Sequence, residues 1–524
     1  METMLKQPIR KYPIGIQSFE KLRRDGYLYV DKTAIIYRLV TTGAPYFLSR
    51  PRRFGKSLLL STLKAYFEGK KELFEGLAIA ELETEWIARP VFHLDLNAEN
   101  YNAPERLEKK LISQLMEWEA RYECDPADWS YSIRFSNVIK AAYEKTGHRV
   151  AILIDEYDKP MLETFHDKEL QDKFRAILVS FYSVLKGADP YLKFILITGV
   201  TKFAQMSIFS TLNQLMDISL MKPYEAICGM TLPEIETTFD PELDAWAVDS
   251  NLPRQAVVDR MTHMYDGYRF SKKQPEGIYN PFSVLNAVNQ LSFSNFWFAT
   301  GTPTFLVHIL RRTEFDVRLL LEGIEVTESS LSTYAADEDD PVPMLYQSGY
   351  LTIKDYKEEY GLYRLEFPND EVKYGLLNYM TKYYTPVLNR DMPFYIGRFN
   401  DELRAGQIDA FMTRMRAFFG GISYELSDDT ERHYHNVFYI VFTLLGQYAE
   451  VEVRSSHDRA DMVVKNKTYI YVFEFKLNGT AEEALAQIDD KDYLIPYTAD
   501  HRQLVKVGVD FDKTTRNIGR WLLA

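Results

Sequence analysis

The sequence of 524 residues contains only two cysteines, Cys124 and Cys228. Two thiols cannot build a disulfide framework or a zinc cluster. No apolar run reaches the roughly 18 residues that a membrane-spanning helix needs, and the polar start 1–7 does not have the pattern of a signal peptide. Glycine and proline occur in ordinary amounts, which argues against disorder. These absences predict a cytoplasmic protein with no membrane segment.

The chain also lacks an excess of basic charge, since its formal net charge at pH 7 is -13. This weighs against a surface that binds nucleic acid everywhere. It leaves room for a local basic groove, because phosphate contacts depend on where lysine and arginine cluster. What the chain has is length and a hydrophobic content of 46%, which is enough for several buried cores. We therefore predict several domains.

The amino-terminal half alternates short apolar runs with helical stretches. Continuous apolar strands separated by helices indicate a parallel sheet that is covered on both faces. The first run continues directly into a glycine-containing loop and then into the helical segment 58–64, which is the strand, loop and helix order of a phosphate-binding loop. The apolar runs are 45–48, 90–96, 150–154 and 193–198.

The loop after the first strand has the composition of a phosphate-binding loop. Lys56 would reach the terminal phosphates of a nucleotide, and the Ser57 hydroxyl would help to bind Mg²⁺. Main-chain N–H groups would meet the phosphates at the positive end of the following helix. The usual first glycine, five residues before Gly55, is here Arg50, and a bare Gly-Lys-Ser also fits a basic helix start. The loop residues predicted to bind the nucleotide are Arg52, Arg53, Phe54, Gly55, Lys56 and Ser57.

A second pair of acidic residues supports the nucleotide site. The apolar strand 150–154 ends in Asp155 and Glu156, in the order found in phosphate-loop ATPases. Asp155 would hold the Mg²⁺ shell, and Glu156 would polarise the attacking water. Thr198, at the end of a later strand, is placed to sense the γ-phosphate. The sequence therefore predicts a site for ATP and Mg²⁺.

The carboxy-terminal region places a second set of acidic residues on a strand. Side chains alternate along 469–476, so Glu474 and Lys476 share one face. A hairpin that turns near 467–468 would set Asp461 opposite Glu474. Two adjacent carboxylates bind a hard cation, Mg²⁺ or Mn²⁺, which activates water, while Lys476 orients or stabilises the nucleophile. A buried ion pair between Glu474 and Lys476 is the purely structural alternative.

The surrounding elements have the order of a restriction-endonuclease-like αβββαβ core. A helix is predicted over 431–447, strands over 449–453, 461–464 and 468–477, a helix over 481–492, and a final strand over 504–509.

Taken together, these motifs resemble those of AAA-ATPase-like proteins joined to a carboxy-terminal PD-(D/E)XK nuclease domain. Loss of the first loop glycine is usual in that family. The resemblance implies that Gln487 touches the nuclease site or its substrate, although a solvent-facing amide is the alternative, and that Glu452 is a further metal ligand. This chain has Asp458 where the family often has glycine. The resemblance rests on Tyr29–Thr33, Arg50–Ser57, Leu153–Asp158, Thr198–Val200, Tyr265–Tyr268, Tyr279–Phe282, Arg459–Asp461 and Glu474–Lys476.

We therefore predict an α/β chain with four parts. A P-loop ATPase domain with a parallel sheet spans 1–230, a helical lid 231–292, an α-rich middle region 293–420, and the nuclease-like domain 421–524.

The predicted function is ATP binding and hydrolysis that controls a metal-dependent nuclease. DNA is favoured over RNA as substrate, and fold analogy suggests defence or mobile-element processing. One alternative is a nucleotide-switched protein that binds nucleic acid through an inactive nuclease fold. Another is a signalling ATPase scaffold with no nucleic-acid partner. Assembly into a homo-oligomer stays open.

Overall fold

The computed structural model divides the chain into two units. Unit 1 comprises residues 1–309 and 325–371, and unit 2 comprises residues 310–324 and 372–524. Among the described residues, no helix has both the length and the apolarity needed to cross a membrane. The finer four-part division stays a prediction. The structure describes residues 10–524 except 44, 98, 127–129, 165–166, 203–214, 301–305, 307–308, 311–312, 314, 333–339, 386–390, 421–430, 448, 454–459, 477–478, 513 and 516, and it does not describe the side chains of 332, 382, 431–435 and 452–453.

Unit 1 is built around a parallel sheet, as predicted. Within the described residues the sheet has five strands in the order β2-β3-β4-β1-β5. Every neighbouring pair is parallel, and β1, β3 and β4 are largely buried apolar runs without alternation, whereas the short edge strand β5 is exposed. Ser49 pairs with Gly199, which brings the carboxyl ends of β1 and β4 to the same edge. The strands are β1 (Pro45–Ser49), β2 (Val91–Asp95), β3 (Val150–Asp155), β4 (Leu192–Gly199) and β5 (Met216–Asp217).

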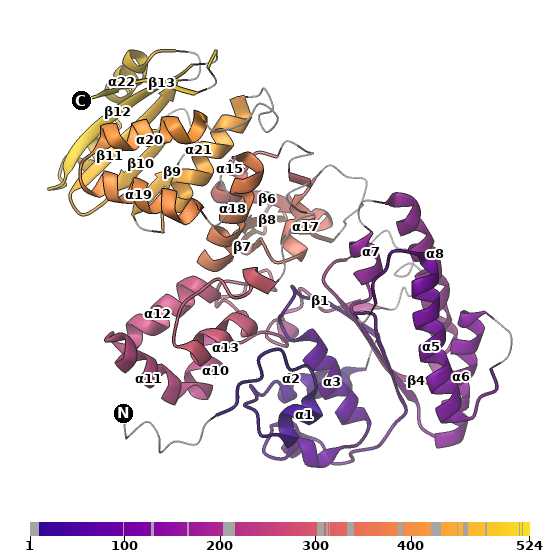
Figure 1. Ribbon diagram of the computed structural model, residues 1–524. Helices are drawn as coiled ribbons and strands as arrows, with labels where there is room; N and C mark the ends of the chain where they lie inside the picture. The colour runs from indigo at the N-terminus through magenta and orange to yellow at the C-terminus, as the bar shows by residue number, and fades with distance from the viewer. Residues whose placement is uncertain are drawn as a thin grey trace. The chain divides into compact units, whose positions relative to one another are not determined.

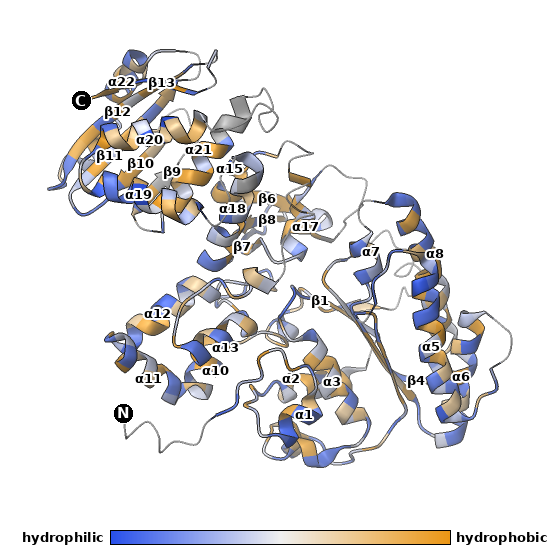
Figure 2. Ribbon diagram, viewed as in Figure 1, coloured by the Kyte–Doolittle hydropathy of each residue, from blue (hydrophilic) through white to orange (hydrophobic). Residues whose placement is uncertain are grey.

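Helices cover both faces of this sheet (Figure 1). The helices α1 (Phe19–Arg24), α2 (Thr33–Thr42) and α3 (Lys56–Phe67) lie on one face, and α5 (Pro104–Tyr122), α6 (Tyr131–Thr146) and α8 (Lys168–Gly187) lie on the other. Hydrophilic residues alternate with hydrophobic ones along α5, α6 and α8, as expected for amphipathic helices (Figure 2). Phe135 on α6 stacks on Phe181 of α8 with ring centroids 4.4 Å apart. Shorter helices are α4 (Ile79–Leu82) and α7 (Lys159–Glu163).

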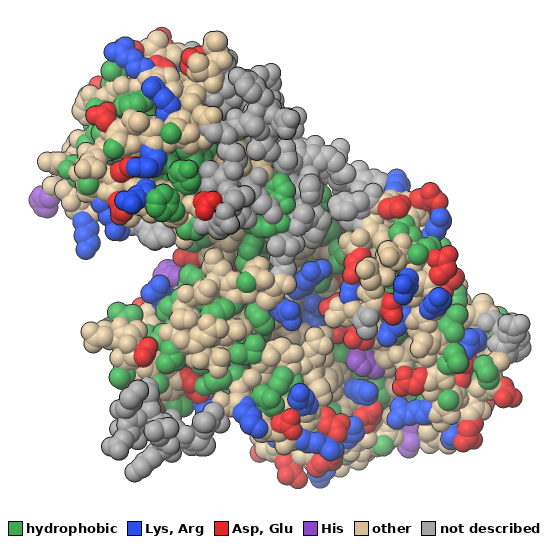
Figure 3. All heavy atoms as spheres, viewed as in Figure 1, with side chains coloured by type: hydrophobic (Ala, Val, Ile, Leu, Met, Phe, Trp, Pro, Cys, Tyr) green, Lys and Arg blue, Asp and Glu red, His purple; other side chains and the backbone are tan. Residues whose placement is uncertain are grey.

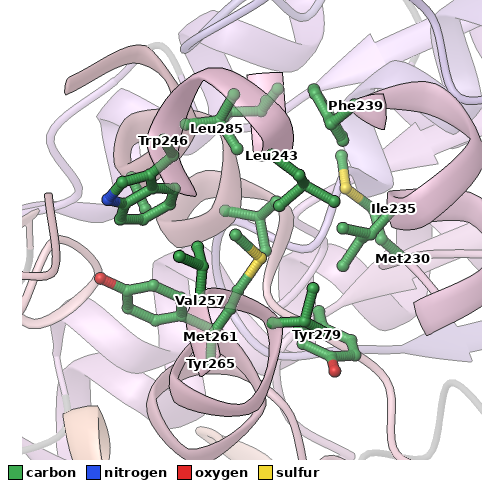
Figure 4. Packing of buried hydrophobic residues seen from close by; sticks show 14 residues of the cluster. Met230, Ile235, Phe239, Leu243, Trp246, Val257, Met261, Tyr265, Tyr279 and Leu285 are labelled. Carbon is green, nitrogen blue, oxygen red and sulfur yellow. The ribbon is translucent and has the colours of Figure 1, made fainter. Parts of the chain in front are cut away.

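A group of helices follows the sheet, and their role as a lid stays a prediction. Their apolar faces meet in a buried cluster that includes Leu243, Trp246 and Met261 (Figure 4). A capping box of Thr231 and Glu234 begins the first helix. The helices are α10 (Leu232–Thr238), α11 (Asp240–Ser250), α12 (Arg254–Tyr265) and α13 (Pro281–Gln290).

The rest of unit 1 contains a small sheet. In the described chain it has three strands in the order β6-β8-β7. The elements are β6 (Ile324–Thr327), α16 (Glu328–Ser332), α17 (Val342–Gln347), β7 (Thr352–Lys357) and β8 (Leu362–Glu366), with the 3-10 turns η2 (Lys71–Phe74), η3 (Asp189–Tyr191), η4 (Lys222–Tyr224) and η5 (Phe298–Thr300) elsewhere in the unit.

Unit 2 contains the predicted αβββαβ core and one further strand. Its described residues form a five-stranded sheet in the order β13-β12-β11-β10-β9. β11 and β12 are parallel and are joined through α22, whereas the other pairs are antiparallel. The core elements are α21 (Glu431–Leu445), β9 (Glu450–Val453), β10 (Met462–Lys465), β11 (Tyr469–Lys476), α22 (Ala481–Asp490), η6 (Ile495–Tyr497), β12 (Gln503–Asp512) and β13 (Asn517–Leu523).

The alternation predicted for β11 decides which side chains enter the core. Phe473 and Phe475 face the helical layer, where Phe475 lies 4.5 Å from Phe438 of α21 between ring centroids. Glu474 and Lys476 therefore face the opposite side of the sheet. The other helices of unit 2 are α15 (Arg318–Glu322), α18 (Asp370–Tyr384, whose first two residues belong to unit 1), α19 (Met392–Arg404) and α20 (Ile408–Gly420).

Candidate functional site

The loop between β1 and α3 has an unusual backbone at two positions. Gly55 has φ 94° and forms the N-cap of α3, and Arg53 has φ 68°. A glycine adopts this left-handed conformation without steric cost. No side chain caps the first turn of α3, so the main-chain N–H groups of this turn are available to donate hydrogen bonds to an anion.

Arg50, which stands where the usual first glycine of such a loop would be, is fixed by several contacts. Its side chain is buried and donates hydrogen bonds to the carbonyl oxygens of Ser49, Ser219 and Tyr224 at 2.9, 2.8 and 3.1 Å. The guanidinium also lies 4.0 Å from the centroid of the Phe270 ring. Burial lowers the pKa of Arg50. The arginine thus anchors the base of the loop to unit 1.

Lys56 is bent back onto its own loop. Its Nζ donates to the carbonyl oxygens of Arg50 and Pro51 at 2.9 and 3.2 Å, and only 5% of the residue is exposed. These two carbonyl groups hold a buried ammonium group that has no carboxylate partner at hydrogen-bond distance among the described residues. A phosphate at the start of α3 would give this charge a stronger acceptor.

The acidic end of β3 is held by hydrogen bonds. The Thr198 hydroxyl donates to Oδ1 of Asp155 at 2.7 Å, and the main-chain N–H of Glu156 donates to the same oxygen at 3.0 Å. Glu156 has φ 49°, in the left-handed region. Burial raises the pKa of Glu156, and the charge of Lys56 opposes that rise. The predicted residues Asp155, Glu156 and Thr198 therefore lie together.

A cavity of about 480 Å³ adjoins the loop and lies wholly within unit 1. All six predicted loop residues line it, as does Glu156, whereas Asp155 and Thr198 are not among its lining residues. Apolar residues from distant segments, among them Ile16, Phe282 and Leu285, line it too. Its size lies in the range of roughly 300–1,000 Å³ that is usual for ligand pockets. The polar loop and the apolar wall suit the phosphates and the base of a nucleotide.

Asp158 is a residue of this cavity that sequence reasoning did not single out. Its Oδ2 accepts hydrogen bonds from the N–H groups of Val200 and Thr201 and from the Thr201 hydroxyl, at 3.0, 2.6 and 2.7 Å. Its Oδ1 is buried and has no hydrogen-bond partner among the described residues. Burial raises the pKa of Asp158. Its position as the third acidic residue in the segment 155–158 is the sequence signal that could have identified it.

Trp297 is a second residue that the sequence did not reveal. Its indole N–H donates to the carbonyl oxygen of Arg52 at 3.1 Å, and its main-chain N–H donates to Glu371 at 2.7 Å. Trp297 and Tyr350, whose ring centroids are 5.2 Å apart, both line the cavity. No spacing or composition in the sequence connects these positions with the loop.

The carboxylates of unit 2 meet where β10 and β11 pair. Met462 is opposite Phe473, so the antiparallel register continues with Asp461 next to Glu474. The N–H of Phe475 donates to Oδ2 of Asp461 at 2.9 Å, and the N–H of Asp461 donates to Oε2 of Glu474 at 3.4 Å. The backbone of the hairpin therefore fixes the two acids beside each other, as predicted from the strand alternation.

Gln487 on α22 joins the acid to the lysine. Its amide nitrogen donates to Oε1 of Glu474, and its amide oxygen accepts a hydrogen bond from Nζ of Lys476. Nζ of Lys476 also lies 3.7 Å from Oε1 of Glu474. Gln487 thus faces this acidic group and not the solvent. The ion pair of the structural alternative is present as well, but it is one contact within a larger group.

Burial and mutual repulsion outweigh the charge of Lys476 in the electrostatics of this acidic pair. Burial and the neighbouring Asp461 raise the pKa of Glu474 to about 7. Burial also raises the pKa of Asp461, while the charge of Lys476 lowers it. A divalent cation would relieve the repulsion between the two carboxylates, and oxygen ligands suit Mg²⁺ or Mn²⁺.

The described residues supply two of the three predicted nuclease ligands. They contain no group of three or more His, Cys, Asp or Glu side chains arranged to hold a metal. The Glu452 side chain lies outside the described residues, and only its backbone on β9, opposite Val463, is placed. At the nucleotide site, Ser57 lines the cavity, whereas Asp155 is buried and is not among the lining residues.

Comparisons with known proteins agree with this arrangement. Residues 13–209 match the family model described as predicted AAA-ATPase, and residues 429–521 match the model of the PD-(D/E)XK nuclease superfamily. Over 521 residues the chain is 36% identical to a protein of Azotobacter chroococcum mcd 1, "Uncharacterized protein in vnfD 5'region", with 97% of this chain and 98% of the relative covered. No solved structure matches the chain.

Proposed function

The chain belongs to the AAA-ATPase-like proteins with a C-terminal PD-(D/E)XK nuclease domain, and we propose on this basis that ATP bound in unit 1 controls a metal-dependent nuclease in unit 2. The observation that carries the proposal is that Asp461 and Glu474 lie together beside Lys476. The side-chain amide of Gln487 forms hydrogen bonds with both Glu474 and Lys476. Such a group has two acids that can hold a cation and a lysine that can orient the nucleophile or stabilise its charge.

In the nuclease unit, Asp461 and Glu474 hold Mg²⁺, with Mn²⁺ as a substitute and Glu452 as a third ligand. The cation supplies an activated water molecule and neutralises the charge that builds on the phosphodiester. Lys476 orients the nucleophile or stabilises its charge. Gln487 keeps Lys476 and Glu474 at a fixed separation, because one amide bonds to both.

In the ATPase unit, the residues 52–57 bind the phosphates, with Lys56 on the terminal ones. Ser57 and Asp155 hold the Mg²⁺ that accompanies ATP, and Glu156 polarises the attacking water. Thr198 acts through Asp155, to which its hydroxyl is bonded. The cavity and the uncapped start of α3 support this assignment.

The substrate we propose is DNA, in preference to RNA, and the setting is defence against foreign DNA or mobile-element processing in the cytoplasm. On the face drawn in Figure 3, Lys and Arg side chains are interspersed with Asp and Glu side chains. Binding would then depend on local groups of basic residues and not on a general positive surface. Several copies of the chain acting together would be compatible with the AAA-like domain.

Cleavage assays test the proposal. Duplex DNA is incubated with Mg²⁺ and ATP together with wild-type protein, Asp461→Ala, Lys476→Ala, or Glu450→Ala, an exposed acid on the same sheet. The proposal predicts cleavage by wild type and Glu450→Ala that is lost in the other two. Cleavage of the DNA at the same background level by all four proteins would overturn the nuclease function. It would favour a nucleotide-switched binding protein instead.

A further inference from the structure

Glu156 lines the nucleotide cavity, but no other side chain holds its carboxylate. Within the part of the chain that the structure describes, the carboxylate forms no hydrogen bond. Only the backbone is fixed, because its N–H donates to Asp155 at 3.0 Å and its carbonyl oxygen accepts from the N–H of Lys159 at 3.1 Å. The water that attacks the terminal phosphate must lie within reach of this carboxylate. The direction of the Glu156 side chain therefore depends on the backbone that carries it.

The backbone of Glu156 has a conformation that is unfavourable for a residue with a side chain. Its φ of 49° lies in the left-handed region, where the Cβ of an L-residue comes too close to the following carbonyl oxygen. Non-glycine residues keep such a conformation where the surrounding structure imposes it, and they concentrate at functional sites. Neighbouring residues must therefore impose the conformation of Glu156.

The residues on both sides of Glu156 are bonded to the end of β4 and the turn that follows it. Before Glu156, Asp155 accepts a hydrogen bond from the Thr198 hydroxyl at 2.7 Å. After it, the N–H of Tyr157 donates to the carbonyl oxygen of Thr198 at 3.1 Å. The Tyr157 hydroxyl donates to the carbonyl oxygen of Thr201 at 3.0 Å. Glu156 therefore lies in a short stretch of backbone that is held at both of its ends.

Asp158 makes the densest of these connections. Its Oδ2 accepts hydrogen bonds from the N–H of Val200 at 3.0 Å and from the N–H and the hydroxyl of Thr201 at 2.6 and 2.7 Å. Asp158 and Thr201 are both buried. Gly199 permits this close approach, because a Cβ at that position would lie 2.6 Å from the ring of Tyr157 and 2.7 Å from Oδ1 of Asp158. The two segments are thus locked together directly after Glu156.

We infer that Asp158 and Thr201 are positioning residues that hold the Glu156 carboxylate toward the attacking water. The inference rests on the proposed ATPase function of unit 1 and deepens it. Hydrogen bonds to a buried carboxylate are strong enough to keep a neighbouring backbone in an unfavourable conformation. Once such a bond is removed, the backbone at Glu156 can relax and turn the side chain away from the water. A misplacement of about 1 Å is enough to slow a reaction strongly.

The chain provides a closely matched control for Thr201. Thr33 also donates both its N–H and its hydroxyl to one carboxylate oxygen, Oδ1 of Asp31, at 2.8 and 2.6 Å. Both threonines are 0% exposed. Thr33 is not among the residues that line the cavity. Replacing it by valine therefore deletes the same kind of buried hydrogen bond without touching the backbone next to Glu156.

Hydrolysis and binding of ATP by the full-length protein are measured separately. Thr201→Val keeps the shape of the side chain and removes only its hydroxyl. It is expected to lower kcat for ATP hydrolysis about tenfold and to leave the affinity for ATP within about twofold of wild type, because the loop that binds the phosphates is unchanged. Thr201→Ser, which keeps the hydroxyl, is expected to restore kcat. Thr33→Val is expected to match wild type in both quantities.

The conformation of Glu156 gives a second readout, which needs neither nucleotide nor Mg²⁺. Glu156→Gly removes the side chain that makes the left-handed conformation unfavourable. Its effect on the melting temperature is measured in the wild-type background and in the Thr201→Val background, so that the entropy which glycine adds to the unfolded chain cancels. The effect is expected to be more favourable by about 2 °C in the wild-type background, because Thr201→Val already lets the backbone relax.

The outcomes separate this inference from the proposed function. Wild-type kcat in Thr201→Val, or an equal effect of Glu156→Gly in both backgrounds, would overturn the inference and leave the proposed ATPase standing. A loss of kcat in Thr201→Ser or Thr33→Val as large as in Thr201→Val would also overturn it, because packing or general destabilisation would then be the cause. Wild-type protein that hydrolyses no ATP would end both proposals.

A second variant keeps the inference testable if thermal unfolding shows that Thr201→Val is misfolded. Tyr157→Phe removes only the hydroxyl that bonds to the carbonyl oxygen of Thr201. It is then expected to lower kcat about fivefold with unchanged affinity for ATP. Wild-type kcat in Tyr157→Phe would count against the inference.

Discussion

The indole N–H of Trp297 donates a hydrogen bond to the carbonyl oxygen of Arg52 at 3.1 Å, across 245 residues of sequence. The predicted phosphate-binding loop is thus held by a side chain from a segment that follows helices α10–α13. Replacing the indole by a phenyl ring removes this hydrogen bond and keeps an aromatic side chain, so the loop should become less well ordered. Trp297→Phe is expected to weaken ATP binding about fivefold, since one such bond contributes about 1 kcal/mol.

Calorimetric titration with ATP measures this effect. The control is Trp521→Phe in unit 2, where the indole N–H bonds to an exposed Asp409. ATP affinity equal to wild type in both variants would show that the Trp297 bond does not position the loop.

Lys56 offers a simpler test of where the nucleotide binds. Its ammonium group already donates to carbonyl groups of its own loop and would exchange them for phosphate. Lys56→Ala is therefore expected to abolish the rise in melting temperature that saturating ATP gives wild type. Lys64→Ala, near the other end of α3, should keep the full rise. An unchanged rise in the Lys56 variant would place the nucleotide elsewhere.

Glu371 makes the stability of unit 1 depend on pH. It is 1% exposed, accepts hydrogen bonds from Ser283 and Trp297 at 2.7 Å each, and burial raises its pKa to about 7 from the ordinary value of 4.5. Between these values the folded protein keeps a proton that the unfolded chain has lost. Its contribution to stability is therefore full below about pH 4.5 and is lost as the pH rises to 7, by on the order of 3 kcal/mol.

Comparison with Glu371→Gln isolates this group, because all other titrating groups are shared. Urea unfolding at pH 5 and pH 8 is expected to show that wild type loses more stability over this range than the variant does. Parallel losses in the two proteins would show that Glu371 is ionised in the folded state at both pH values.

Gln487 is expected to matter for cleavage without contributing a charge. One amide bonds to Glu474 and Lys476, so its loss releases both side chains. Gln487→Ala should lower the rate of DNA cleavage about 10- to 100-fold, since bonds to charged groups contribute about 1.5–3 kcal/mol. Gln503→Ala, at an exposed position on β12 of the same sheet, is the control. Single-turnover cleavage at equal rates in both variants would contradict the positioning role.

The sequence predicted the parts of this molecule that local physics determines. Pairing of Asp461 with Glu474 follows from strand alternation, because a shift by one residue would turn Glu474 toward the aromatic core that holds Phe473 and Phe475. Asp155 ends a buried strand and Glu156 follows it, so their place at the sheet edge was also predictable.

Contacts between segments that are far apart in the sequence could not be predicted from local patterns. Trp297 reaches the loop through one hydrogen bond, and Asn436 holds the backbone of Phe315 and Val317 through two. Such contacts leave no periodic signal in the sequence. The strand β13 also escaped prediction, since Asn517–Leu523 includes a glycine and an arginine among its apolar residues. The interleaving of 310–324 with 372–524 in unit 2 depends on contacts of the same kind.

We propose that Asp461 and Glu474 share one divalent cation beside Lys476. The most direct measurement is anomalous diffraction from crystals soaked in Mn²⁺ without nucleotide, for wild type and for Asp461→Asn. Wild-type crystals are expected to show a manganese peak between the two carboxylates, and Asp461→Asn crystals are expected to lack it. Wild-type crystals with no peak there, at a concentration that saturates other Mn²⁺ sites, would contradict it.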